Sequence, residues 1–168
     1  ADATTIAASE MANITKVETI NITGTTAAQG LELHNNNATY TSSASYQTIT
    51  MTSSLTTGSA TLDASAEADA KVVLTGSGGT GADILIGSAS TNLGDTITAN
   101  AGNDTIKFAS TSFTSADIVD GGAGTDTIEM TTNGSTVVDA DFTNVTNVEK
   151  ITSTADAQMT SLTLGALA

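Results

Sequence analysis

Apolar and polar residues alternate over short stretches of this chain, which is the pattern of a half-buried strand. The stretches 47–51, 60–64 and 71–75 each set isoleucine, leucine, valine or methionine among threonine and other polar residues. Leu31 and Leu33 show the same period of two, and serine, threonine and glycine separate the stretches. The pattern predicts many short strands joined by turns.

Helical periodicity is almost missing. Only residues 6–11 and 139–142 have a composition that fits a short helical turn. We therefore expect an all-β chain with few helical residues.

From residue 78 onward the pattern becomes a glycine-rich turn followed by a very short strand. Residues 78–86 and 121–129 both fit G-G-x-G-x-D-x-U-x, in which U is a large apolar residue. Residues 99–107 keep the last glycine, the aspartate and the apolar residue of the pattern. Residues 94–98 and 115–120 keep only the aspartate and the apolar residue. The aspartates of these units are Asp83, Asp95, Asp104, Asp117 and Asp126.

The residue types in this pattern favour calcium. Glycine permits positive φ, so the first six residues can turn tightly and direct several carbonyl oxygens into one small volume. The aspartate adds a charged oxygen, and Ca²⁺ takes roughly 6–8 oxygen ligands. Each unit buries little surface alone, so neighbouring units and the metal must supply stability.

Composition narrows the class of protein. The 168 residues carry a net charge of −14, with 4 basic residues, all lysine. Such a charge argues against nucleic-acid binding and against anionic membranes. About one residue in five is threonine, there is no cysteine, proline or tryptophan, and only 3 are phenylalanine. A thin solenoid suits this composition better than a thick core, and no apolar run approaches the length of a membrane span.

A longer repeat joins the two ends of the chain. Residues 13–20 and 144–151 share asparagine, threonine, valine, glutamate and isoleucine at one offset, which also aligns Leu33 with Leu164. Together with the start at Ala1 rather than at methionine, this repeat favours a fragment of a larger array. We expect a solenoid segment over 1–77, a calcium-binding roll over 78–129, and a second copy of the first unit, continuous with the roll, over 130–168.

No catalytic constellation is present, so the chain is not expected to be an enzyme. His34 is the only histidine and lies beside a run of asparagines, which indicates a solvated loop. A zinc site built on a histidine pair is therefore excluded, and a Ser-His-Asp triad has no supporting motif. Glu18 and Glu149 recur in the terminal repeat and are expected to be solvated, with pairing to Lys16 or Lys150 as the alternative.

The nonapeptides resemble the RTX family of calcium-binding repeats. The resemblance implies a right-handed parallel β-solenoid with an RTX β-roll, in which alternate turns stack over each other. Asp83, Asp104 and Asp126 would then line one edge, and Asp95 and Asp117 the other. The resemblance assigns one Ca²⁺ to oxygens of Gly79, Gly81, Asp83, Ala99, Ala101 and Asp104. It assigns a second Ca²⁺ to oxygens of Asn100, Gly102, Asp104, Gly121, Ala123 and Asp126. Ala99 and Asn100 replace the glycine pair, which predicts strain at both sites.

The opposite edge is a weaker candidate for metal binding. Its loops are longer than the pattern and mostly lack the glycines, so Asp95 and Asp117 are equally compatible with a filled site or none. Asp120 and Glu129 flank the last nonapeptide and are further candidate ligands.

The whole chain is similar to RTX-type surface-layer proteins of Gram-negative bacteria. Nonapeptides, a bias to threonine, alanine, serine and glycine, absence of cysteine, and units such as TNVTNVEKI carry this resemblance. It implies type I secretion, calcium-driven folding at the cell surface, self-assembly into a two-dimensional lattice, and attachment to surface polysaccharide. A module of a large RTX adhesin and the secretion and folding tail of an exported hydrolase are the alternatives.

Overall fold

The computed structural model describes residues 4–7, 19–23, 29–32, 48–132, 136–154 and 161–163. The predictions made for Leu33, His34 and Leu164 lie outside these residues.

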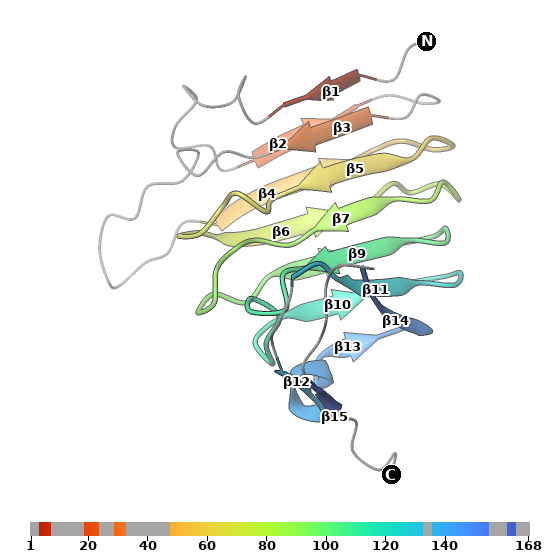
Figure 1. Cartoon of the computed structure of the whole chain (residues 1–168). Coiled ribbons are helices and arrows are strands. Elements are labelled where there is room, and N and C mark those ends of the chain that lie inside the picture. The colour runs from red at the N-terminus through yellow and green to blue at the C-terminus, as the bar shows by residue number, and fades with distance from the viewer. Residues whose placement is uncertain are drawn as a thin grey trace.

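The chain winds into a β-solenoid whose stacked coils build two parallel sheets. The N-terminal strand lies at one end of the stack and the C-terminal strands lie at the other (Figure 1). Successive strands alternate between the sheets, so each coil gives one strand to each sheet. The seven-stranded sheet consists of β1 (Thr4–Ile6), β3 (Gln29–Glu32), β5 (Ala60–Asp63), β7 (Ile84–Ile86), β9 (Thr105–Phe108), β11 (Thr127–Met130) and β14 (Lys150–Ser153). The six-stranded sheet consists of β2 (Thr19–Ile22), β4 (Thr48–Ser53), β6 (Lys71–Thr75), β8 (Thr96–Thr98), β10 (Ile118–Asp120) and β13 (Val145–Thr146). The predicted all-β, parallel β-solenoid fold is confirmed.

The core is a pair of apolar ladders, one on the inner face of each sheet. Parallel pairing without a register shift places the apolar residue of each strand directly over that of the next coil. The seven-stranded sheet contributes the buried residues Leu31, Leu62, Leu85, Ile106 and Ile128. The six-stranded sheet contributes Met51, Leu74, Ile97 and Val119. Each such side chain contributes roughly 1.5–3 kcal/mol of transfer free energy when fully buried.

The three phenylalanines of the chain gather at one place beside this core. The ring centroid of Phe113 lies 5.0 Å from that of Phe108 and 5.1 Å from that of Phe142. Phe142 belongs to η1 (Asp139–Phe142), a 3₁₀ helix that confirms the predicted helical turn at 139–142. The other predicted helical turn begins at Ile6, which instead ends β1, and residues 8–11 of it lie outside the described ones.

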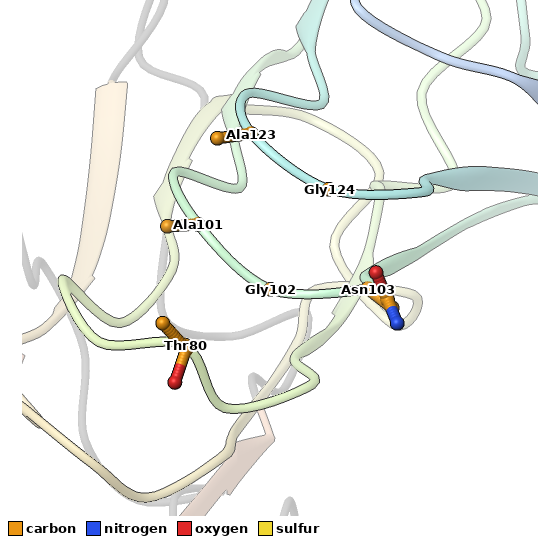
Figure 2. Close-up of a pocket in the computed structure, with 6 residues that line it drawn as sticks. All are labelled: Thr80, Ala101, Gly102, Asn103, Ala123 and Gly124. Carbon is orange, nitrogen blue, oxygen red and sulfur yellow. The ribbon is translucent and has the colours of Figure 1, made fainter.

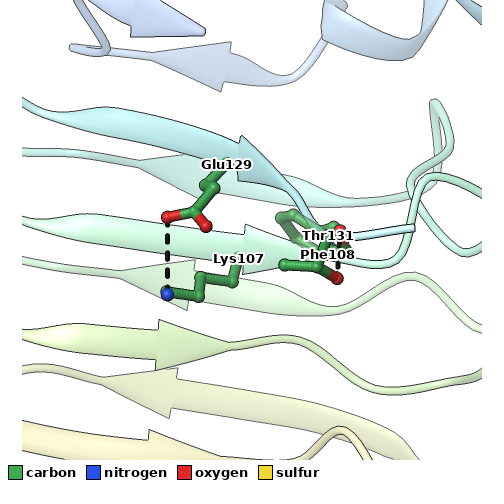
Figure 3. A network of polar contacts seen from close by, with 4 residues as sticks. All are labelled: Lys107, Phe108, Glu129 and Thr131. Atoms are coloured by element: carbon green, nitrogen blue, oxygen red, sulfur yellow. Dashed lines mark hydrogen bonds and ion pairs between the residues drawn. The ribbon is translucent and has the colours of Figure 1, made fainter. Parts of the chain in front are cut away.

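Polar side chains lie on the outer face of the seven-stranded sheet at β9 and β11, whereas Ile84 of β7 is exposed on that face. The Lys107 ammonium on β9 lies 3.4 Å from the Glu129 carboxylate on β11, its partner in register (Figure 3). The Thr131 hydroxyl donates to the Phe108 carbonyl at 3.1 Å at the end of the same strands. Glu129 therefore points away from the glycine-rich turns and is engaged with a lysine.

The two copies of the terminal repeat occupy different places in the coil. Thr19–Ile22 forms β2 of the six-stranded sheet, whereas the equivalent Lys150–Ser153 forms β14 of the seven-stranded sheet. Strand β15 (Ser161–Thr163) pairs with β12 (Thr136–Val138) in a separate two-stranded sheet. Strands β13 and β14 nevertheless extend both main sheets beyond residue 129. The three-part division of the chain stays a prediction.

We predict that Ile106→Val lowers the free energy of unfolding by about 0.5–1.5 kcal/mol, because it removes a methylene from a closely packed ladder. Ile84→Val is the matched control, since Ile84 lies one strand away and is 37% exposed while Ile106 is 0% exposed. Chemical denaturation of both variants checks this. Equal losses for the two would contradict the ladder as the main source of stability.

Candidate metal centre

The turns that lead from the six-stranded to the seven-stranded sheet stack along one side of the solenoid, which we call the glycine edge. It comprises residues 76–83, 99–104 and 121–126, and their compact loops lie at the right of Figure 1. The turns that lead back, residues 64–70, 87–95 and 109–117, form what we call the opposite edge. Asp83, Asp104 and Asp126 therefore lie on the first and Asp95 and Asp117 on the second.

Glycine is required on the glycine edge because neighbouring turns lie in backbone contact. Gly122 has φ 91°, and a Cβ there would overlap the carbonyl oxygen of Asn100. Gly124 has φ 146°, and a Cβ there would overlap the carbonyl oxygen of Gly102. Only glycine combines the left-handed backbone with such an approach at no steric cost.

The expected strain at the missing glycine pair is relieved at both positions. Asn100 takes φ 76°, a conformation that asparagine tolerates better than most residues. Its side-chain amide donates to the carbonyl oxygens of Gly76 at 3.0 Å and Ser77 at 3.3 Å, which ties this turn to the one before it. Ala99 is buried, is not among the positive-φ residues, and donates its N–H to Asp120 O at 2.9 Å.

A ladder of carboxylates runs along the glycine edge. Asp104 Oδ1 accepts the Asp83 N–H at 2.8 Å, and Asp126 Oδ1 accepts the Asp104 N–H at 2.8 Å. The ladder starts where Asp83 Oδ1 accepts the Ala60 N–H at 2.6 Å and ends where Glu149 Oε2 accepts the Asp126 N–H at 2.7 Å. Glu149 is exposed, as expected of a solvated residue, and in addition it accepts this hydrogen bond.

The aspartates of the glycine edge differ in whether their second carboxylate oxygen, Oδ2, accepts a hydrogen bond. Asp104 Oδ2 and Asp126 Oδ2 are buried and have no hydrogen-bond donor. Asp83 Oδ2 accepts the Ser77 N–H at 2.6 Å, and the Ser77 hydroxyl donates to Asp83 Oδ1 at 3.1 Å. A buried carboxylate oxygen without a partner is costly, so on the glycine edge Asp104 and Asp126 are the two positions that need a cation or a proton.

On the opposite edge, hydroxyl residues satisfy Asp95 and Asp117. Asp95 accepts the Ser88 N–H at 2.7 Å and the Ser88 hydroxyl at 2.9 Å. Asp117 accepts the Thr114 N–H at 2.7 Å, and its Oδ1 accepts the Asp95 N–H at 2.7 Å. These carboxylates have the contacts that a metal ion would otherwise supply.

The remaining predicted ligands can now be placed. In the first set, Gly79 and Gly81 stack on the earlier turn 54–59, where a Cβ on either would overlap a carbonyl oxygen. In the second set, the turns 99–104 and 121–126 pair directly, since Ala123 N–H donates to Asn100 O at 2.7 Å. Gly102 N–H donates back to Ala123 O at 2.9 Å. Each of these carbonyls keeps a second lone pair.

An open hollow of about 430 Å³ follows the tips of these stacked turns (Figure 2). Its lining is mostly main chain and small side chains, from Thr80, Ala101, Gly102, Asn103, Ala123 and Gly124. Among the described residues no three histidine, aspartate, glutamate or cysteine side chains converge. An ion on this edge would therefore depend on two carboxylates together with carbonyl oxygens, which is a donor set suited to Ca²⁺.

Asp120 is held by other contacts. Its Oδ1 accepts the Gly122 N–H at 3.1 Å and the Asn147 side-chain amide at 2.8 Å. The sequence did not predict these contacts, nor the caps from Ser77, Ser88 and Thr114. Serine or threonine placed before an aspartate is common in loops, so the sequence carries little signal for such a cap.

Burial raises the pKa of Asp95, Asp104 and Asp126. It raises the pKa of Asp104 to about 6, helped by the charges of Asp83 and Asp126 and opposed by the hydrogen bond from Asp83. Burial also raises the pKa of Asp126, with the charges of Glu149 and Asp120 acting in the same direction. Desolvation raises the pKa of Asp95 to about 6.

Comparison with known proteins supports the repeat. A family model described as RTX calcium-binding nonapeptide repeat (4 copies) matches residues 90–107 and 114–129. The matches contain Asp95, Asp104, Asp117 and Asp126, and they do not extend to the unit at 78–86. No curated protein and no solved structure matches the chain. The chain thus carries RTX calcium-binding repeats on a β-solenoid.

We predict that Gly122→Ala destabilises the protein by at least about 1–2 kcal/mol, because alanine is disfavoured in the left-handed region and its Cβ has no room. Gly78→Ala is the control in the other full nonapeptide, since a Cβ there meets no atom within 4 Å. Thermal unfolding of both variants provides the measurement. A Gly122→Ala protein as stable as Gly78→Ala would contradict the close turn contact.

We predict that the metal-free protein becomes less stable as the pH rises through about 6. A raised aspartate pKa means that the folded state binds more protons than the unfolded state, so the free energy of unfolding falls with rising pH in that window. Melting temperatures in chelator at pH 5 and pH 7 measure this, and Asp104→Asn should flatten the dependence. A melting temperature that rises from pH 5 to pH 7 would contradict the raised pKa values of Asp95 and Asp104.

Proposed function

We propose that this chain is a structural calcium-binding segment of a secreted bacterial surface-layer protein, and that calcium completes its fold and promotes lattice assembly. The observation that supports it best is the pair of buried, unpartnered oxygens Asp104 Oδ2 and Asp126 Oδ2 on stacked turns. Both aspartates lie within the residues that match the RTX repeat.

The residues that would hold the ion belong to the two stacked turns with these oxygens. We propose Asn100, Gly102, Asp104, Gly121, Ala123 and Asp126 as the principal site. A site of Gly79, Gly81, Asp83, Ala99, Ala101 and Asp104 is the weaker one, because Ser77 already caps Asp83. Asp95 and Asp117 are capped as well, so we propose no ion on the opposite edge near them.

The net charge of the chain explains why folding would wait for calcium. A charge of −14 makes the metal-free chain repel itself, and the ladder brings carboxylates of successive coils into line. Bound Ca²⁺ supplies positive charge between the turns, and its binding free energy becomes folding free energy. Low calcium would keep the chain extended for type I secretion, and high calcium outside the cell would fold it.

The surface-layer role has further support from the chain itself. The repeat shared by residues 13–20 and 144–151 suits an array protein, and strands β13 and β14 continue the solenoid past the nonapeptides. Among the described residues, no helix could span a membrane. Self-association in a lattice and attachment to surface polysaccharide are parts of this proposal.

We predict that millimolar calcium raises the melting temperature and increases the β signal in circular dichroism, with magnesium much less effective. A ligand at 100 times its Kd stabilises by about 2.7 kcal/mol. Asp104→Asn/Asp126→Asn should lose most of this response. Asp95→Asn/Asp117→Asn is the matched control, which should be less stable in chelator yet keep the response.

Two results would count against the proposal. Identical melting curves in chelator and in calcium would contradict calcium-dependent folding. A protein that responds to calcium but stays monomeric in analytical ultracentrifugation at millimolar calcium would contradict the assembly role and support only a calcium-stabilised solenoid.

A further inference from the structure

A buried glutamate lies on the opposite edge, outside the residues that match the RTX repeat. Glu67 sits in the turn 64–70 between β5 and β6, and its exposed fraction is 0%. Glutamate is almost never fully buried without a partner. Its neighbour Asp69 is half-buried in the same turn.

Hydrogen bonds from two coils fix the position of Glu67. Its Oε1 accepts the N–H groups of Ala68 and Asp69, each at 3.1 Å. Its own N–H donates to Ala64 O at 2.9 Å, and its carbonyl accepts the Ala89 N–H of the next coil at 2.7 Å. The side chain is therefore held in place rather than displaced to solvent.

The other oxygen of Glu67 has no such partner. Glu67 Oε2 and Asp69 Oδ1 are both buried and both lack a donor. Burial, followed by a side-chain hydrogen bond with the Asp69 carboxyl, raises the pKa of Glu67 to about 7. No lysine of the described residues is ion-paired with either group; the one described ion pair joins Lys107 and Glu129. Two adjacent carboxylate oxygens without another donor need either a cation or a shared proton between them.

No hydroxyl group caps Glu67 Oε2 or Asp69 Oδ1, whereas hydroxyl residues cap Asp95 and Asp117 on the same edge. Ser88 caps Asp95 and Thr114 caps Asp117. In the turn 64–70 the only serine is Ser65, which is exposed and donates its N–H to Asp63 at 2.8 Å. The turn thus holds two oxygens that no residue of the described chain satisfies.

We propose that Glu67 and Asp69 form a calcium site of their own, separate from the nonapeptide turns, with Glu67 Oε2 and Asp69 Oδ1 as its protein ligands. Both ligand oxygens are buried, so water would have to reach the ion past the exposed turn residues Ser65, Ala66 and Ala68 to complete the coordination. With so few protein ligands the affinity falls in the range of extracellular modules, at a Kd of roughly 10⁻⁴–10⁻³ M. Such a site would extend calcium stabilisation to the coil that precedes the matched repeats.

Isothermal calorimetry of the 168-residue chain with CaCl₂ at pH 7.5 tests this site. Glu67→Gln should bind one ion fewer than the unchanged chain, because the amide keeps the shape and removes the charge. Glu129→Gln is the matched control and should keep the full number. In the Asp104→Asn/Asp126→Asn background one weak ion should remain, and Glu67→Gln should remove it.

An unchanged ion count in Glu67→Gln would overturn the proposal. If that variant also melted at a higher temperature in chelator at pH 7, a proton shared by the two carboxyls would be the occupant instead. Asp69→Asn, at a half-buried position, gives the same test if Glu67→Gln fails to fold. Loss of ions only in Asp104→Asn/Asp126→Asn would support the nonapeptide site and overturn this one, so the two failures are distinguishable.

Discussion

The fold depends on a hydrogen bond between a carboxylate and the backbone of the preceding coil. Asp104 accepts the N–H of Asp83, Asp126 accepts that of Asp104, and Asp117 accepts that of Asp95. Parallel strands lie about 4.7–4.9 Å apart, so an aspartate at the start of each strand reaches the coil before it. The interaction connects each coil to the one before it, and it places carboxylates inside the protein, where charge is expensive.

The two edges of the solenoid deal with this cost in different ways. On the opposite edge, Ser88 and Thr114 donate to Asp95 and Asp117. On the glycine edge, no serine or threonine of the turns 99–104 and 121–126 donates to Asp104 or Asp126, and each keeps one open oxygen. The presence of a serine or threonine cap therefore decides which carboxylates depend on an external cation. The same chemistry explains why Asp83, in a longer turn with Ser77, resembles the capped group.

Glycine serves this arrangement by letting turns approach each other, and asparagine substitutes for it at one place. Gly122 and Asn100 both have positive φ, and the amide of Asn100 binds the turn before it. A departure from the glycine pattern therefore adds a contact between coils. The short turn 147–149 ends the stack, and Glu149 takes the acceptor role that aspartate has elsewhere.

The sequence by itself determined the parallel β-solenoid, most strand positions, the 3₁₀ turn at 139–142, and the order of the aspartates. It could do so because strand alternation and the nonapeptide are local patterns in which each residue type has one physical task. Only the tertiary structure decided which carboxylate oxygens are satisfied, because the caps and acceptors come from loop side chains and from neighbouring coils. It also placed the two terminal repeats in different sheets, and it buried oxygens of Glu67 and Asp69 in one turn of the opposite edge, since burial depends on what the adjacent coils cover.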